Sequence, residues 1–405
     1  MKRKLRRSVS ASTKKPISPL HPHVECFTRN LVGQGYSQDG VAYRHRLLTG
    51  LDPWLLQQGL NLRDLSEERI EQFLRDRHEQ YSAQIADKPV LQAFLAYLRS
   101  EKVVPHAVAK RTKNPIDRLQ RSFAAYLAEE RGVKESTQRQ YLDVTRSFLS
   151  RCSGNVESLS AQDVAKFILN RAEVISPNSA QRATTALRNF FQFLYQQGHV
   201  EVDLRASVPT VANWRLSGVP QHLSTDKIES LLKQCDQDSA IGQRDYAMLL
   251  LLARLGLRAG EVIHLTLDDI DWHNSEITIR GKGNRGDRLP IPQDVGQALV
   301  RYLRQTRPLC ASRRVFIRLR APHQGLVHSS TVSSIVHHAL QRAGLTPTGA
   351  HVLRHSLASR MLRGGACLTE IGKVLRHQLV RTTAIYAKVD LCNLRMLAHP
   401  WPGGK

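Results

Sequence analysis

The sequence predicts a mainly α-helical protein with one small β-hairpin. Two helical regions are expected in the N-terminal half and an α+β domain in the C-terminal half. Three observations lead to this prediction. The chain has 405 residues, too many for one compact core and typical of two or three domains. Two stretches with a similar amphipathic pattern follow one another before residue 205. Beyond residue 222, strand-like alternation is confined to one pair of short segments in an otherwise helical pattern.

The two helical regions share an order of elements. Ser66 and Ser160 each precede acidic or amide residues and then apolar residues at helical spacing, which is typical of a capped helix start. A second amphipathic helix follows in each region, around Leu91 and around Leu187. The offsets are 94 residues for the serines and 96 for the leucines. Two tandem domains of similar plan are expected, and two unrelated helical domains are the alternative.

The C-terminal half is predicted to begin after a weakly periodic segment with Pro and Gly, and Ser224 is expected to cap its first helix. A strand at 276–280, a turn at 281–287 and a returning strand at 288–292 form the hairpin. Further helices are expected at about 244–255, 293–306, 329–343, 351–363, 369–376 and 380–386. The predicted division is a basic, disordered tail at 1–22, helical domains at 23–107 and 108–205, a linker at 206–221, the α+β domain at 222–398 and a short tail at 399–405.

The charge balance favours a polyanionic partner. There are 59 Lys and Arg against 35 Asp and Glu, which gives a net charge of +24; nucleic acid is the first candidate partner, and a merely basic or ribosome-associated protein is the alternative. Seven Lys and Arg and no acid lie within residues 1–23, without the apolar core of a signal peptide. The six cysteines form no CxxC pair, and the apolar runs are far shorter than the ~20 residues of a membrane span. A reducing, cytoplasmic location is therefore expected.

A set of residues suited to phosphodiester chemistry follows in a distinctive order. Such chemistry requires a nucleophile, cations that stabilise the phosphoryl oxygens and an acid for the leaving oxygen. Arg258 lies in a Gly-Leu-Arg turn and Lys282 lies between two glycines at the hairpin tip. His351, Arg354 and His355 form an H-x-x-R-H pattern; His377 and Tyr386 follow, nine residues apart with a Thr-Thr pair between them. Singly, each has an ordinary explanation, such as a surface ion pair, a flexible basic turn or a packed aromatic. Together, their order is improbable by chance.

On these residues the C-terminal domain resembles the tyrosine recombinase family, also called phage integrases. The resemblance covers about 222–392, and the preceding helical domain resembles the family's DNA-clamping core-binding domain. One departure is visible, because the residue before the late histidine is usually Gly and here is Arg376. This puts the local turn geometry in question and could add a phosphate contact. The catalytic set that the resemblance implies is Arg258, Lys282, His351, Arg354, His377 and Tyr386.

The resemblance implies a role for each residue. Arg258 and Arg354 would grip the non-bridging phosphate oxygens, with a hydrogen bond from His377. Tyr386 would attack phosphorus while His351 accepts its proton, and Lys282 would protonate the departing 5′-oxygen. The bond energy would be kept in a 3′-phosphotyrosine, so that no metal or other cofactor is expected.

The implied function is site-specific recombination of double-stranded DNA. By resemblance, it would proceed in a homo- or hetero-tetramer, with companion recombinases as further partners, at the nucleoid. A type IB topoisomerase or a catalytically inactive DNA-binding protein is the alternative. The additional N-terminal domain and the basic tail favour integration or transposition of a mobile element. The DNA site, the direction of reaction and the accessory proteins are left open by the sequence.

Overall fold

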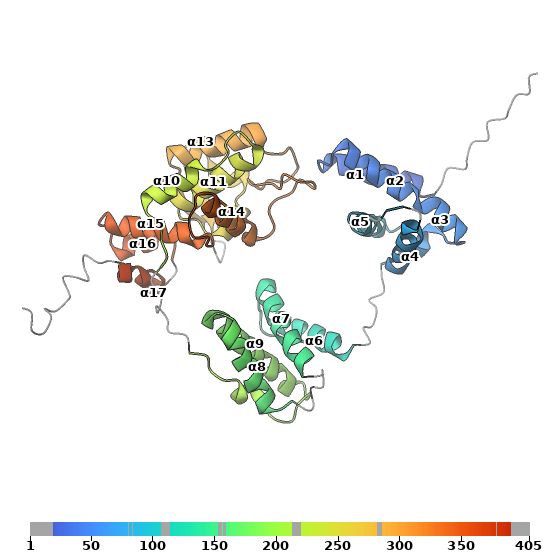
Figure 1. Cartoon of the computed structure of the whole chain (residues 1–405), viewed down its shortest axis with the longest axis horizontal. Helices are drawn as coiled ribbons and strands as arrows, with labels where there is room; N and C mark the ends of the chain where they lie inside the picture. Colours follow the sequence, from blue (N-terminus) through green and yellow to red (C-terminus); the bar gives the residue numbers. More distant parts are fainter. Residues whose placement is uncertain are drawn as a thin grey trace, which may run out of the picture. The chain divides into compact units, whose positions relative to one another are not determined.

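The computed structural model describes residues 19–79, 81–82, 84–106, 114–152, 156, 159–212, 220–281, 286–377 and 379–389. Most of these residues are helical, and one small antiparallel sheet lies in the C-terminal part (Figure 1). The predicted fold class is therefore confirmed. The chain forms two compact units, residues 1–106 with 218–405 and residues 107–217. The finer domain boundaries given above stay a prediction.

The N-terminal helices enclose a core of their own. Phe27, Phe73 and Phe94 are buried, and Phe27 and Phe94 meet edge to face, as do Trp54 and Phe73. The Ser66 hydroxyl accepts a hydrogen bond from the Arg69 N–H, as the predicted cap requires. The elements are α1 (His21–Gly33), α2 (Gln38–Thr49), α3 (Leu51–Gln57), the 3₁₀ turn η1 (Leu62–Asp64), α4 (Glu67–His78) and α5 (Asp87–Ser100).

The second unit has four helices among its described residues, and they enclose an aromatic core. Phe123, Phe148 and Phe190 are fully buried, and Ser160 begins α8 with the predicted cap, closed into a capping box by Asp163. Val208, within the segment predicted as a linker, is buried against this core. The elements are α6 (Pro115–Glu129), α7 (Glu135–Arg151), α8 (Ala161–Val174), α9 (Pro177–Gln196) and the 3₁₀ turn η2 (Leu204–Ser207).

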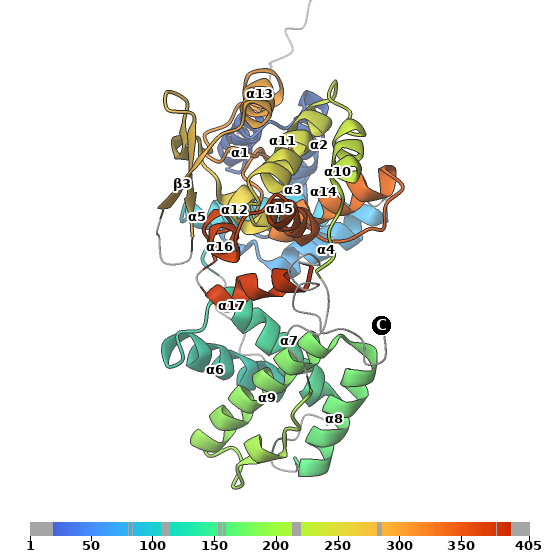
Figure 2. The ribbon, with the colours of Figure 1, turned by 90° about the vertical axis from the view of Figure 1, so that its left-hand side faces the viewer.

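Helix α11 is the centre of the C-terminal body. Residues 247–253 are all at most 1 % exposed, and a helix that is apolar all round must be covered on every side. It contacts α10, α12, α13, α14 and α15 (Figure 2). The helical elements are α10 (Thr225–Lys233), α11 (Ala240–Arg254), α12 (Ala259–His264), the 3₁₀ turn η3 (Leu267–Asp269), α13 (Gln293–Arg301), the π-turn η4 (Tyr302–Thr306), α14 (Ser329–Arg342), α15 (His351–Arg363), α16 (Leu368–Val374), α17 (Val380–Thr383) and the 3₁₀ segment η5 (Ala384–Val389).

The sheet confirms the hairpin and corrects its details. Strands β1 (Ile270–Asp271), β2 (Glu276–Arg280) and β3 (Gly286–Pro290) pair antiparallel in chain order. The returning strand begins two residues earlier than predicted, because Arg280 pairs with Gly286 and Ile277 with Leu289. Ladder pairing sets this register, whereas alternation along one chain leaves it open by a residue or two. The predicted helix at 293–306 also changes type, from α to π, after Arg301.

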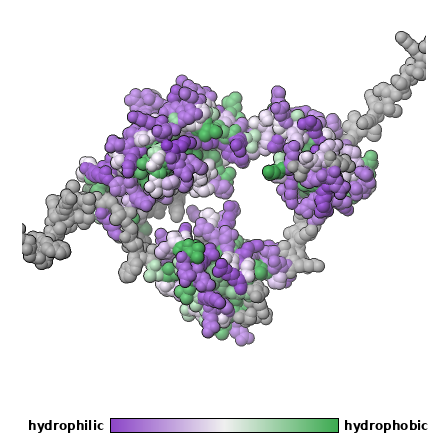
Figure 3. Space-filling model, viewed as in Figure 1, coloured by the Kyte–Doolittle hydropathy of each residue, from purple (hydrophilic) through white to green (hydrophobic). Residues whose placement is uncertain are grey.

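Hydrophilic residues predominate on the face shown in Figure 3, with apolar residues scattered among them. Within the described ranges, no helix combines the length and the apolar character that a membrane span requires.

Candidate active site

Five of the six predicted site residues lie in the described part of the chain, on four neighbouring elements. Arg258 precedes α12, His351 and Arg354 lie on α15, His377 follows α16, and Tyr386 lies in η5. Helix α15 contacts both α16 and η5, and α16 contacts η5. Lys282 falls outside the described residues, between the end of β2 and the beginning of β3 in the sequence.

The Gly-Leu-Arg turn needs a glycine at its first position. Gly256 has a φ of 60°, and a Cβ built there would lie 2.8 Å from a Leu375 methyl carbon and 2.9 Å from one of Leu357. A side chain at this position would therefore be both strained and obstructed. This glycine lets the end of α11 approach α15 and α16 closely, and so places Arg258 beside them.

Arg354 joins the ends of two helices. Its guanidinium donates to the backbone carbonyls of Gly256 and Leu375, which follow the last turns of α11 and α16. The residue is 3 % exposed. Burial, and then the nearby Arg258 and Arg376, lower the pKa of Arg354 to about 10, which leaves it charged at neutral pH.

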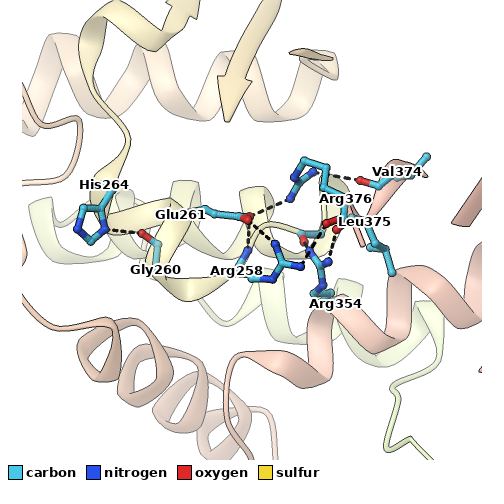
Figure 4. Close-up of polar contacts among 9 residues, drawn as sticks. Arg258, Gly260, Glu261, His264, Arg354, Val374, Leu375 and Arg376 are labelled. Atoms are coloured by element: carbon cyan, nitrogen blue, oxygen red, sulfur yellow. Dashed lines mark hydrogen bonds and ion pairs between the residues drawn. The ribbon is translucent and has the colours of Figure 1, made fainter. Parts of the chain in front are cut away.

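Glu261 lies between two arginines (Figure 4). Its Oε1 accepts from Arg258 Nη1 at 2.7 Å, and its Oε2 accepts from Arg376 Nη2 at 2.9 Å and from the Arg258 backbone N–H at 2.8 Å. Burial alone would raise the pKa of Glu261, but Arg376 and Arg258 outweigh it and bring the pKa below its usual value. Arg354 also interacts electrostatically with Glu261, so that three guanidinium charges act near one carboxylate and leave an excess of positive charge.

Arg376, which replaces the usual glycine of the family pattern, lies in the turn that ends α16. The Arg376 N–H donates to Lys373 and the His377 N–H donates to Gly372, which are the two bonds of a Schellman motif at the end of α16. Arg376 takes the left-handed position of this motif, with a φ of 55°. That position suits glycine, and another residue costs roughly 1–2 kcal/mol there. The turn therefore keeps its geometry with an arginine in place of glycine.

Two histidines lie beside Tyr386. Its hydroxyl shares a 2.9 Å hydrogen bond with His355 Nδ1, and its ring lies parallel to that of His377, with centroids 6.4 Å apart. The residue is 1 % exposed. Burial raises the pKa of Tyr386, partly offset by Arg354. The hydroxyl is therefore protonated at neutral pH and needs an acceptor before it can act as a nucleophile.

His351, His355 and His377 have lowered pKa values and are therefore neutral at neutral pH. Burial, and then Arg354 and Arg258, lower the pKa of His377 to about 4, and its Nδ1 shares a 2.8 Å hydrogen bond with the buried Thr383 hydroxyl. Burial and neighbouring cations also lower the pKa of His351 and of His355. Neutral imidazoles can accept a proton, and they can donate one hydrogen bond to a phosphate oxygen.

Some members of this site were not among the predicted residues. His355, Glu261, Arg376 and Thr383 all contact the predicted set. The H-x-x-R-H spacing already placed His355 one turn beyond His351, on the same face of a helix. His351 lies beside it, with ring centroids 6.3 Å apart. The sequence contained this signal, but the choice between the two histidines requires the fold.

Family models and related sequences match most of the chain. The model of the Phage integrase family matches residues 221–391, and that of the phage integrase N-terminal SAM-like domain matches residues 121–198. A putative integrase/recombinase of Sinorhizobium fredii, y4rA, is 42 % identical over 400 residues, which is 97 % of each chain. The tyrosine recombinase XerD of Listeria monocytogenes is 30 % identical over 282 residues, 67 % of this chain and 94 % of XerD.

Solved structures share the fold. A XerH site-specific recombinase bound to palindromic difH substrate superimposes with a TM-score of 0.52 at 16 % identity, over 93 % of both chains. A lambda integrase dimer bound to a COC′ core site also gives 0.52 at 16 % identity, over 78 % of this chain and 89 % of that one. Fold and sequence together define a tyrosine-type site-specific recombinase. The chain belongs to the phage integrase family.

Proposed function

We propose that the chain cleaves and rejoins DNA through Tyr386, with Arg258 and Arg354 as the cations that stabilise the scissile phosphate. The observation that carries this proposal is the hydrogen bond of the Tyr386 hydroxyl to His355, with His377 beside the ring and the buried Arg354 near enough to interact electrostatically with Tyr386. A phenol, imidazoles that can accept protons and guanidinium groups are the parts that strand transfer requires.

In the proposed step, the phenolic oxygen of Tyr386 attacks phosphorus and its proton passes to a histidine. The bond from phosphorus to the 5′-oxygen breaks, and Lys282 supplies the proton that this oxygen takes up. The product is a 3′-phosphotyrosine and a free 5′-hydroxyl, and the reverse step rejoins a strand. Because Tyr386 is 1 % exposed, η5 has to shift for the hydroxyl to reach a phosphate in DNA.

We also propose that four protomers act on two recombination sites and that the chain serves a mobile element. Support for the second point comes from residues 19–106, which form a helical body outside both family matches. The putative integrase/recombinase of S. fredii matches over this region as well, since it covers 97 % of the chain. Sequencing the DNA on both sides of the gene tests this role, since a mobile element predicts terminal repeats or companion recombinase genes.

A trapping experiment tests the chemistry. A pool of randomised duplexes with a single nick is incubated with the protein, because loss of the short fragment beside the nick prevents rejoining. Adducts that survive denaturing detergent are collected and the attached DNA is sequenced. Wild type should yield adducts with a shared sequence, carried by Tyr386. Tyr386→Phe should bind DNA and yield none; adducts from that variant would show that another residue is the nucleophile.

A further inference from the structure

Arg376 has a strained backbone conformation, and one of its buried side-chain donors is unpaired among the described residues. Its backbone is left-handed, where glycine is favoured, and its side chain is 6 % exposed. Nη2 donates to Glu261 and Nη1 donates to the Val374 carbonyl at 3.1 Å, but the buried Nε has no hydrogen-bond partner among the described residues. Helix capping alone does not account for an arginine here, because glycine would cap α16 without strain.

The contacts of Glu261 indicate what Arg376 does. Arg258 is the more accessible of the two arginines, with a side chain 40 % exposed against 6 % for Arg376. Glu261 binds both, one on each carboxylate oxygen. Without Arg376, the buried carboxylate would be balanced by Arg258 alone, and the pair would have no net charge. With Arg376, the three groups together carry +1.

We propose that Arg376 is a positioning residue that takes up the charge of Glu261 and so keeps the positive charge of Arg258 available to the scissile phosphate. This inference rests on the role proposed above for Arg258. It places Arg376 behind Arg258, because Glu261 lies between the two guanidinium groups and the Arg258 side chain is the more exposed of the two. A direct phosphate contact by Arg376 is the competing explanation, and the two differ in how they depend on Glu261.

The test compares single-turnover adduct formation by wild type, Arg376→Gly, Glu261→Gln and the double variant. Arg376→Gly relieves the left-handed strain, so folding should be retained, as its thermal midpoint will show. Its rate should fall, by less than the ~10²–10³-fold loss typical of removing a direct transition-state donor. Glu261→Gln removes the negative charge and keeps an acceptor oxygen. The double variant should therefore recover most of the lost rate.

Two further variants sharpen the test. Arg376→Lys keeps the charge and the left-handed strain, so it should retain most of the rate. Arg301→Ala removes one exposed arginine from α13 and should leave the rate unchanged, which controls for the overall charge of the domain. Arg376→Gly reacting as fast as wild type overturns the inference. A double variant no faster than Arg376→Gly also overturns it, since a direct contact cannot be restored by neutralising Glu261.

Equilibrium binding separates this inference from the proposed function. If wild type forms no adduct, the proposed function fails. The affinity of each variant for a fluorescent duplex then tests the charge-balancing role of Arg376 independently. Arg376→Gly should bind more weakly than wild type and the double variant should regain affinity, because the same charge balance acts on a bound phosphate. Equal affinities for all four proteins would contradict the role given to Arg376.

Discussion

His355 Nδ1 and the Tyr386 hydroxyl lie 2.9 Å apart, which joins the middle of α15 to η5. A buried phenol next to an imidazole of lowered pKa has an acceptor for its proton within hydrogen-bond distance. The sequence assigned that role to His351, one helical turn earlier. In the structure, the hydroxyl contacts His355.

The first prediction separates the two histidines by pH. An acceptor must be neutral, and burial lowers the pKa of both residues below 6.5. The rate of adduct formation should therefore hold from neutral pH down past about 6.5, the usual histidine pKa, and fall only at lower pH. His355→Ala should react more slowly and lose this acid limb, whereas His351→Ala should keep it. Single-turnover rates from pH 5 to 8 decide, and the opposite result would return the role to His351.

This pair shows where sequence reasoning reaches its limit. The types of residue followed from the chemistry of phosphodiester transfer, and their assignment to positions along the chain followed from the resemblance to the tyrosine recombinases. Which histidine meets the tyrosine did not, because residues four apart share a helix face. The choice depends on where η5 crosses α15, and that contact lies 31 residues further along the chain.

Arg376 shows a second limit. The sequence showed that a glycine of the family pattern was replaced, and it raised both a changed turn and an additional phosphate contact. The structure keeps the turn, at a φ of 55°, and directs the guanidinium to Glu261. The partner is 115 residues away in the chain, so neither local spacing nor helix periodicity could have identified it.

The second prediction concerns stability against pH. His351, His355 and His377 have folded pKa values below the value of about 6.5 for an unfolded histidine. The unfolded chain therefore binds protons first as the pH falls. The contribution of these neutral histidines to the free energy of unfolding is therefore complete above about pH 6.5 and is lost progressively below it, towards pH 4 for His377. The thermal midpoint should drop steadily between pH 7 and pH 5.

Two variants test whether the site histidines cause this loss of stability at low pH. His377→Gln can still bond to Thr383 but cannot take up a proton, so its midpoint should fall less between pH 7 and pH 5. His338→Gln changes an exposed histidine on α14 and should follow wild type. If His377→Gln falls as steeply as wild type, the site histidines do not control acid stability.

The third prediction concerns salt. A protein with a net charge of +24 should bind non-specific duplex through phosphates, and log affinity should fall against log salt with a slope of about −0.9 per phosphate contacted. Residues 1–18 lie outside the described structure and carry seven Lys and Arg. Deleting them should weaken binding and flatten the slope, and adduct formation should survive. A tail of equal length with those seven residues changed to Gln should behave like the deletion; wild-type affinity would show that the charge of the tail is irrelevant.

The last prediction identifies the acid that protonates the leaving group. Lys282→Ala should slow adduct formation strongly on an ordinary nicked duplex, because the departing 5′-oxygen then has no proton donor. A duplex with sulfur in place of that oxygen needs no proton and should restore much of the rate. Arg354→Ala should stay slow on both substrates, because its proposed role is charge stabilisation. Lys227→Ala removes an exposed lysine from α10 and should react like wild type on both. Equal rescue of Lys282→Ala and Arg354→Ala by sulfur would contradict the separate roles proposed for them.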